Sequence, residues 1–456
     1  MQQEMFSDTH LVMRLHRAGS ELGAQLVASA ALPLQAYLST LVPSGPARAS
    51  LSLSLLIEAL ARHLHDQREP DADDWCEALV RHPMIQQADH SSLLLDHETL
   101  LNNVLFATAA RLSGVRRVVT VQCSSVSCIT QRAPFRGPPF LHSRGVQFNV
   151  FGRSIRTYAH AAFCALAGPV RSSFAPMAGS TVSLSGDPLL AKWIDHPWPS
   201  ALDGMRHMNN ALWRAMGGDE LAQLLILDDR LSNELIALHV ERPDSPIHRL
   251  LFDLTARQTF LTTKRSLVAR PSNIAVNRAE PDFFWFRRDQ RLLPVVMHDE
   301  GRRPVCVDGM SESLLDTMSS PRAVADALRC GVLVPDRVLI YFARCLLPGV
   351  RAIGGTSQQD YVALYRELLI ECDRELGLLD AAERANLAGP TPTRLGGAPL
   401  IELSAEMELA LAMSGLDVDW TGLLEPVMLR PLADTVGHFR CANYLERGIA
   451  RASERQ

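Results

Sequence analysis

Lysine is almost absent from this chain. Of its 45 basic residues only Lys192 and Lys264 are lysines, and arginine supplies all the others. Codon bias in a GC-rich genome accounts for such a preference. It still restricts function, because arginine keeps its charge in proteins. Chemistry that needs an amine able to lose its proton, such as Schiff-base formation, therefore has two candidate residues.

Close cysteine pairs and long apolar runs are also missing. The nine cysteines form no CxxC pair, which excludes a zinc ribbon or a redox motif of that spacing. The odd number, with no basic segment followed by an apolar run and a cleavage site, predicts a reducing cytoplasmic location. Charge or proline interrupts the longest apolar runs, and none is long enough to cross a bilayer.

The net charge of −5 provides no general attraction to nucleic acid or to anionic membranes, so neither is expected as a partner. A small-molecule substrate is the partner that we expect, and the oligomeric state stays open. Apolar residues make up 47% and charged residues 21% of 456, which is typical of a folded globular protein. That length suits one large α/β domain with additions, or two to three ordinary domains.

Hydrophobic periodicity predicts the order of elements. The first 80 residues have helical spacing. A helix over 98–113, a stop at Gly114 and an apolar strand over 115–123 then form half of a βαβ unit. A helix over 203–217 precedes a second buried strand, AQLLILDD, and a strand pair covers 282–308 with a hairpin turn at EGR. Residues 130–154 are expected to be rich in loops, and TYAHAAFCALAG to be helical.

Because helices separate the strands, these patterns predict an α/β fold. We expect a mostly parallel, Rossmann-like sheet with helical N-terminal and C-terminal additions. The expected organisation is a helical region over 1–80, an α/β core over 81–388 and a helical region over 389–456. Ser320 and Gly331 match the cap and the stop of one helix in that core.

The stretch QQADHSSLLLDHETLLNNVLF, residues 86–106, concentrates polar groups in an apolar context. His90 is expected in a loop, Asp96 as the N-cap of the next helix, and His97 and Asn103 in its first turns. Such a helix N-terminus beside two imidazoles can bind a carboxylate or phosphate. The structural alternative is that Asp96 is only a cap, His97 an exposed residue and Asn103 a satisfied core amide.

A second candidate is RAIGGTSQQDYVALYREL, residues 351–368. It predicts a strand end, a turn at Gly354 and Gly355, and a helix opened by Thr356 or Ser357. Main-chain N–H groups at such a turn can hold an anion. A plain strand-to-helix turn explains the pattern as well. The spacing matches neither GxGxxG nor GxxxxGK[ST], so no cofactor is assigned.

Two further candidates lie at expected strand ends. Gln122 and Cys123 follow the first core strand; Gln122 is a candidate ligand contact, and Cys123 is either a nucleophile or a buried structural thiol. Acidic groups follow two other strands, as Asp228 and Asp229 and as His298, Asp299 and Glu300. If all these strands belonged to one parallel sheet, these groups would share a cleft and could act as a general base or metal ligands.

Two segments taken in order resemble proteins related to the bacillithiol-synthesis cysteine ligase. They are QADHSSLLLDHETLLNNVLFATAARLSG and LVPDRVLIYFARCLLPGVRAIGGTSQQDYVALYREL, together about 60 residues, which makes the match a short-motif one. The resemblance implies a Rossmann-like core and a condensation that joins cysteine to an amino-sugar conjugate. The cleft residues that it implies are His90, His97, Asn103, Gly354, Gly355, Asp360 and Tyr361. The chain departs from the family in lacking a GQQ-type strand-loop run and a charged C-terminal coiled coil.

These observations favour a small-molecule biosynthetic enzyme that joins or transfers a group on an amino-acid-like substrate. His90 would be the general base, assisted by His97, and Tyr361 an orienting hydroxyl. Gly354, Gly355 and Thr356 would hold an anion. The alternatives are a non-catalytic interaction or carrier-docking subunit, and a metal-dependent hydrolase that uses the acidic strand ends.

Overall fold

The N-terminal part of the chain is helical, as predicted. In a computed structural model the described residues are 10–87, 93–94, 97–122, 140–143, 146–152, 169–176, 183–184, 190–216, 218, 220–270, 273, 276, 281–288, 291–299, 301, 303–306, 312–389, 392–401 and 419–436. The first helices are α1 (Leu11–Arg17), α2 (Glu21–Ser29), α3 (Leu34–Ser39), α4 (Leu51–Asp66) and α5 (Ala72–Arg81). Ser20 and Ser50 begin α2 and α4 by accepting a hydrogen bond from a main-chain N–H three residues on.

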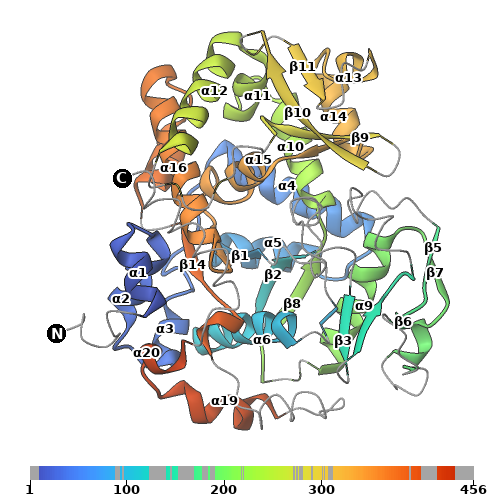
Figure 1. Cartoon of the computed structure of the whole chain (residues 1–456), viewed down its shortest axis with the longest axis vertical. Helices are drawn as coiled ribbons and strands as arrows, with labels where there is room; N and C mark the ends of the chain where they lie inside the picture. Colours follow the sequence, from blue (N-terminus) through green and yellow to red (C-terminus); the bar gives the residue numbers. More distant parts are fainter. Residues whose placement is uncertain are drawn as a thin grey trace.

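A five-stranded parallel sheet forms the centre of the molecule (Figure 1). Its strands are β1 (Met84–Gln87), β2 (Arg117–Val121), β8 (Gln223–Leu227), β13 (Arg351–Gly354) and β14 (Thr393–Leu395). In space they follow the order β14-β13-β1-β2-β8, and every neighbouring pair is parallel. The chain therefore winds outward from β1 in one direction and later returns to the other side of it. The predicted Rossmann-like core is confirmed.

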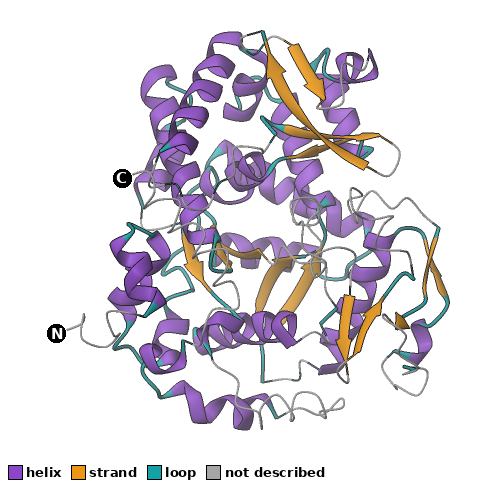
Figure 2. Ribbon diagram, viewed as in Figure 1, coloured by secondary structure: helices purple, strands orange, loops and turns teal. Residues whose placement is uncertain are grey.

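Helices cover both faces of this sheet, because its strands are apolar on both faces. Ile85, Val119 and Val121 belong to one core cluster, while Met84 and Val118 belong to the other. The first face carries α4, α5, α10 (Arg230–Glu241), α15 (Arg337–Tyr341) and the π-helical turn η4 (Phe342–Leu346), as Figure 2 shows. The second face carries α6 (His97–Leu112), α9 (Ala201–Met216) and α3.

A second, four-stranded sheet is antiparallel. It consists of β9 (Phe284–Arg288), β10 (Arg291–His298), β11 (Arg303–Cys306) and β12 (Leu333–Pro335), in the order β11-β10-β9-β12. The hairpin predicted within 282–308 is confirmed. The expectation that its strands share the parallel sheet is wrong, because short connections join β9 to β10 and β10 to β11, and only antiparallel strands can be joined so closely. Helices α11 (Pro246–Phe252), α12 (Leu254–Ala269), α13 (Glu312–Thr317) and α14 (Pro321–Arg329) accompany this sheet (Figure 1).

The remaining elements are short strands outside the two large sheets and the helices toward the C-terminus. Residues 130–154 contain strands β3 (Phe140–Ser143) and β4 (Val146–Asn149), which pair with each other and with β6 (Ala175–Pro176); β5 (Val170–Ser172) pairs with β7 (His196–Trp198). The helix predicted at 157–168 lies outside the described residues. Toward the C-terminus follow α16 (Gln358–Leu376), α17 (Ala381–Ala388), α19 (Trp420–Met428) and α20 (Leu432–Thr435), with the 3₁₀ turns η3 (Ala191–Trp193) and η5 (Ala398–Leu400). The central sheet takes β14 from beyond residue 388, the boundary expected for the core.

Among the described helices, none combines the length and the apolar character needed to span a membrane.

Candidate functional site

The two sequence segments with the strongest functional patterns arise from adjacent strands. β1 pairs with β13, and the last residues of the two strands, Gln87 and Gly354, lie opposite each other. The winding direction of the chain changes between these strands, so their carboxyl ends flank the switch point of the sheet. In open α/β sheets ligands bind in the crevice at this point. The carboxyl ends of β1 and β13 therefore lie side by side.

The turn after β13 has the form expected of an anion cradle. Helix α16 begins directly after Gly354, Gly355, Thr356 and Ser357, and its N-cap Ser357 makes no side-chain capping bond. The first turn of a helix leaves main-chain N–H groups without helical partners, and its dipole favours a negative charge. Gly355 is exposed, and a Cβ atom added there would meet no atom within 4 Å. A ligand can therefore approach the main chain at Gly355.

Gly354 is glycine for a different reason, since a Cβ atom on it would lie 1.7 Å from Oε1 of Gln358. Gln358 is buried and donates a hydrogen bond from Nε2 to Oγ1 of Thr393, at 3.1 Å. This contact links the first turn of α16 to β14. Close packing of helix and sheet therefore requires the small residue at the end of β13.

The adjacent asparagines of the opening segment connect three strand ends. Nδ2 of Asn103 donates to the carbonyl of Thr99, and its Oδ1 accepts from Nε2 of Gln122 at 3.2 Å. Oδ1 of Asn102 accepts from the main-chain N–H of Ala398, and its carbonyl accepts from Nε2 of Gln86. Asn103 and Gln122 are fully buried. Asn103 thus matches the structural alternative of a satisfied core amide, and a role for Asn103 or Gln122 in binding substrate stays a prediction.

Asn209 extends this network to the loop after β1. Its Nδ2 donates to Oε1 of Gln122 at 2.9 Å, and its Oδ1 accepts from the main-chain N–H of Leu94 at 3.0 Å. Leu94 lies between His90 and His97 in the sequence. His90 is outside the described residues, and α6 begins at His97. The amide network therefore reaches the main chain at Leu94, between the two histidines in the sequence.

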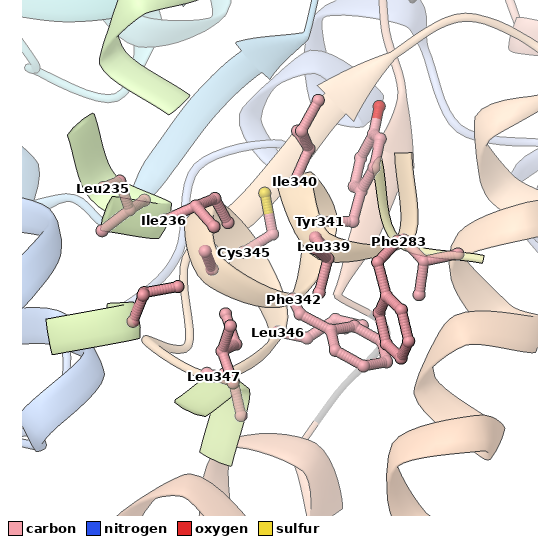
Figure 3. Close-up of a cluster of buried hydrophobic side chains, with 14 of the residues drawn as sticks. Leu235, Ile236, Phe283, Leu339, Ile340, Tyr341, Phe342, Cys345, Leu346 and Leu347 are labelled. Carbon is pink, nitrogen blue, oxygen red and sulfur yellow. The ribbon is translucent and has the colours of Figure 1, made fainter. Parts of the chain in front are cut away.

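Tyr361 lies in a buried aromatic group beside the start of α16. Its hydroxyl is 2.8 Å from the hydroxyl of Tyr341, and the two rings meet edge to face with centroids 5.3 Å apart. Figure 3 shows the Tyr341 hydroxyl and the Cys345 sulfur on one side of their helix, opposite Phe342. On that side Nε2 of Gln87 donates to the Cys345 sulfur at 3.5 Å. One helix thus contacts both the end of β1 and the first turn of α16.

Asp360 faces away from this crevice toward α2. Its carboxylate accepts hydrogen bonds from the Ser20 hydroxyl, at 2.9 Å, and from the main-chain N–H of Glu21, at 2.7 Å. Burial raises the pKa of Asp360 to about 6, although these hydrogen bonds act to lower it. The structure thus accounts for Asp360 as a cap of α2 and does not bring it together with Gly355.

The acidic pair after β8 is held by arginines. Asp228 is fully buried and contacts Nε of Arg206 at 3.2 Å and Nη2 of Arg230 at 2.5 Å. Burial would raise the pKa of Asp228, but the Arg230 hydrogen bond and the charges of His63, Arg230 and Arg206 outweigh it and lower the pKa to about 2. Asp228 is therefore a structural counter-ion. Its neighbour Asp229 also has a partner, since its carboxylate accepts a hydrogen bond from the hydroxyl of Ser232 at 3.5 Å.

His298 and Asp299 do not join this pair. His298 is the last residue of β10 in the antiparallel sheet, and Asp299, which follows it, contacts Arg303 at 2.8 Å. The expectation of one cleft shared by the acidic strand ends is therefore wrong. Within the described ranges, no three His, Cys, Asp or Glu side chains form a group able to hold a metal ion. Glu300 and Cys123 lie outside those ranges.

The two lysines are not placed at the parallel-sheet edge. Nζ of Lys264 donates to the carbonyls of Pro281 and Asp282 and to the carboxylate of Asp336, so all three of its donors are used. Lys192 is exposed in η3, 4.6 Å from the centre of the Trp193 ring.

The sequence interpretation missed Gln86, Gln87 and Asn209. The pattern that could have identified them is a polar residue at a position that the hydrophobic periodicity predicts to be buried. In the structure all three side chains are at most 3% exposed. Comparison with protein-family models and with curated protein sequences yields no match to this chain, so its function is argued from its own residues.

Proposed function

We propose that this chain is an enzyme of small-molecule biosynthesis that joins or transfers a group on an amino-acid-like substrate. The substrate's anionic group would bind in the crevice between the ends of β1 and β13. The observation that supports this proposal is the pairing of Gln87 with Gly354, because it places the end of the strand that precedes His90 in the sequence beside a helix N-terminus that is open to a ligand.

The roles in this proposal follow from position. The N–H groups of Gly355 and Thr356, just before the first turn of α16, hold the anionic group. His90, which follows β1 in the sequence, acts as the general base, and His97, the first residue of α6, is the second catalytic histidine. Tyr361 is buried and bonded to Tyr341, so it positions the first turn of α16. A condensation on cysteine, as the ligase resemblance implies, is the reaction to test first.

Calorimetric titration of the full chain with L-cysteine and the other L-amino acids tests the binding step. The wild type should bind at least one of them, and Gly355→Ala should weaken that binding about tenfold or more, because the added methyl group occupies the ligand's approach to the main chain. Gly45→Ala is the matched control, since Gly45 is also an exposed glycine with nothing within 4 Å of an added Cβ atom. Equal weakening in both variants would contradict the proposal.

Turnover of the substrate found in this way tests the catalytic step. Replacing His90 by alanine should reduce kcat about 10²-fold or more, the usual contribution of a general base. An unchanged kcat would remove His90 from that role. If no small molecule binds and an obligate partner co-purifies instead, the chain is an interaction subunit.

A further inference from the structure

Arg344 is a buried cation without a counter-ion. It lies in the π-helical turn η4 and is 1% exposed, among the largest fully buried side chains of the protein. Its Nε and Nη1 atoms are buried and have no hydrogen-bond partner. Across the part of the chain that the structure describes, no carboxylate lies within 4 Å of its guanidinium.

This arrangement is costly in a protein without ligand. Arginine cannot lose its proton to escape burial, and an isolated buried charge is strongly disfavoured unless it is paired. The other buried carboxylates of the described core already have partners. They are Asp228 with Arg206 and Arg230, Asp229 with Ser232, Asp282 with the N–H of Met297, Asp336 with Lys264, and Glu383 with Ser52. The partner that Arg344 needs is therefore expected from outside the chain.

The helical turn that carries Arg344 borders the switch point of the sheet, since η4 packs against β13. Arg344 comes three residues after Tyr341 and immediately before Cys345, and Figure 3 shows the polar ends of these two side chains on the same side of their helix. Tyr341 contacts Tyr361 of α16, and Cys345 contacts Gln87 at the end of β1. Oε1 of Gln87 is also buried without a hydrogen-bond partner. The helix that carries Arg344 thus bridges the two elements that border the crevice.

The π-helical turn gives this placement a structural reason. A π turn adds one residue to a helix, which shifts the direction of the side chains that follow, and such turns are frequent at functional sites. Leu347 donates its N–H to the carbonyl of Phe342, five residues back, which is the bond that defines the turn. Phe342 packs in the apolar core against Phe260, and Arg344, two residues later, is buried as well.

We propose that Arg344 is a substrate-binding residue that pairs with an oxyanion of the ligand in the crevice between β1 and β13. The ligand class is a small molecule with a carboxylate or a phosphoryl group, both of which match the guanidinium fork. The uncharged main-chain N–H donors at the N-terminus of α16 and the charged guanidinium of Arg344 would then bind the same anion. This inference rests on the proposed function and adds to it the charged group that selects anionic substrates.

The test compares three forms of the full chain, the wild type, Arg344→Met and Arg366→Met, at constant ionic strength. Arg366 is the matched control because it is partly buried and already bonded to the carbonyls of Leu387 and Gly389. Melting temperature is measured against inorganic phosphate and, separately, against acetate. The wild type should be stabilised by at least one anion. A response to phosphate alone indicates a phosphorylated substrate, and a response to acetate alone indicates a carboxylate.

Arg344→Met should melt at the wild-type temperature or above it without anion, since an unpaired buried charge is removed, and should bind the effective anion at least tenfold more weakly. Arg366→Met should melt lower and keep the anion response. Arg344→Lys, which retains a charge without the planar fork, should bind with intermediate affinity and serves if Arg344→Met does not fold.

Two results would overturn the inference: an undiminished anion response in Arg344→Met and Arg344→Lys, or no response to either anion in the wild type. If the two Arg344 variants keep the full anion response but Gly355→Ala loses it, the proposed function stands and Arg344 takes no part in binding the anion. Absence of any amino-acid binding in the wild type is the separate result that contradicts the proposed function.

Discussion

Replacing Asp228 by asparagine should destabilise the fold strongly, because this buried carboxylate balances two arginines. Its pKa falls from an ordinary value of 3.8 to about 2 in the folded protein. That difference stabilises the folded state by about 2.5 kcal/mol at neutral pH, since a tenfold change in proton affinity corresponds to about 1.4 kcal/mol. Arg206 and Arg230 would also lose their shared partner, which brings the expected loss to about 3 kcal/mol.

The pH dependence of this loss has a definite sign. A carboxyl group whose folded pKa is depressed stabilises the protein fully above its unfolded pKa, near 4, and loses that contribution as pH falls through the folded value of about 2. The difference in stability between the wild type and Asp228→Asn should therefore be constant from pH 7 to pH 5. By pH 3 it should shrink by about 1 kcal/mol.

Urea unfolding followed by circular dichroism at pH 7, 5 and 3 measures these differences. Asp244→Asn is the control, because Asp244 forms an exposed pair with Arg242, at 3.3 Å, and such pairs contribute about 1 kcal/mol or less. A loss below about 1 kcal/mol in Asp228→Asn, or a difference that grows as pH falls, would refute the assignment of Asp228 as a structural counter-ion.

Three further substitutions test the scaffold around the crevice. Gly354→Ala should cost about 1 to 3 kcal/mol in thermal unfolding, because the new methyl group displaces the buried Gln358 side chain from its hydrogen bond; an unchanged melting temperature would contradict this packing. Asn209→Ala should cost about 2 kcal/mol and accelerate hydrogen exchange at the Leu94 amide, and equal protection in both proteins would exclude the anchoring role. Because the folded pKa of Asp360 is raised to about 6, the protonated carboxyl group stabilises the folded state at low pH. This stabilisation is lost as the pH rises from about 4 to 6. Asp360→Asn should therefore gain about 2 kcal/mol relative to the wild type between pH 4 and pH 7 in urea unfolding, and a difference independent of pH would show that the folded pKa is ordinary.

Local patterns predicted much of the secondary structure around the site, but not the strand β1, whose four residues include two glutamines. The apolar runs that became β2 and β8, the stop at Gly114 and the turn from β13 into α16 follow from interactions between residues near each other in sequence, which periodicity and capping chemistry capture. The Rossmann-like sheet followed from the alternation of these elements. The placement of His298 failed because nothing local to β10 states which sheet it joins.

The sequence by itself predicted the glycine turn and the helix that follow the strand β13, and the capped helix that follows His90, but it did not identify β1, which precedes His90, as a strand. Only the tertiary structure decided that these two strands are neighbours, because the pairing of Gln87 with Gly354 joins residues more than 250 positions apart. It also decided that Asp360 caps α2 and that Arg344 is buried without a counter-ion. Burial and partnership of a polar side chain depend on every element that packs around it, and a local pattern contains only the residues nearby in the chain.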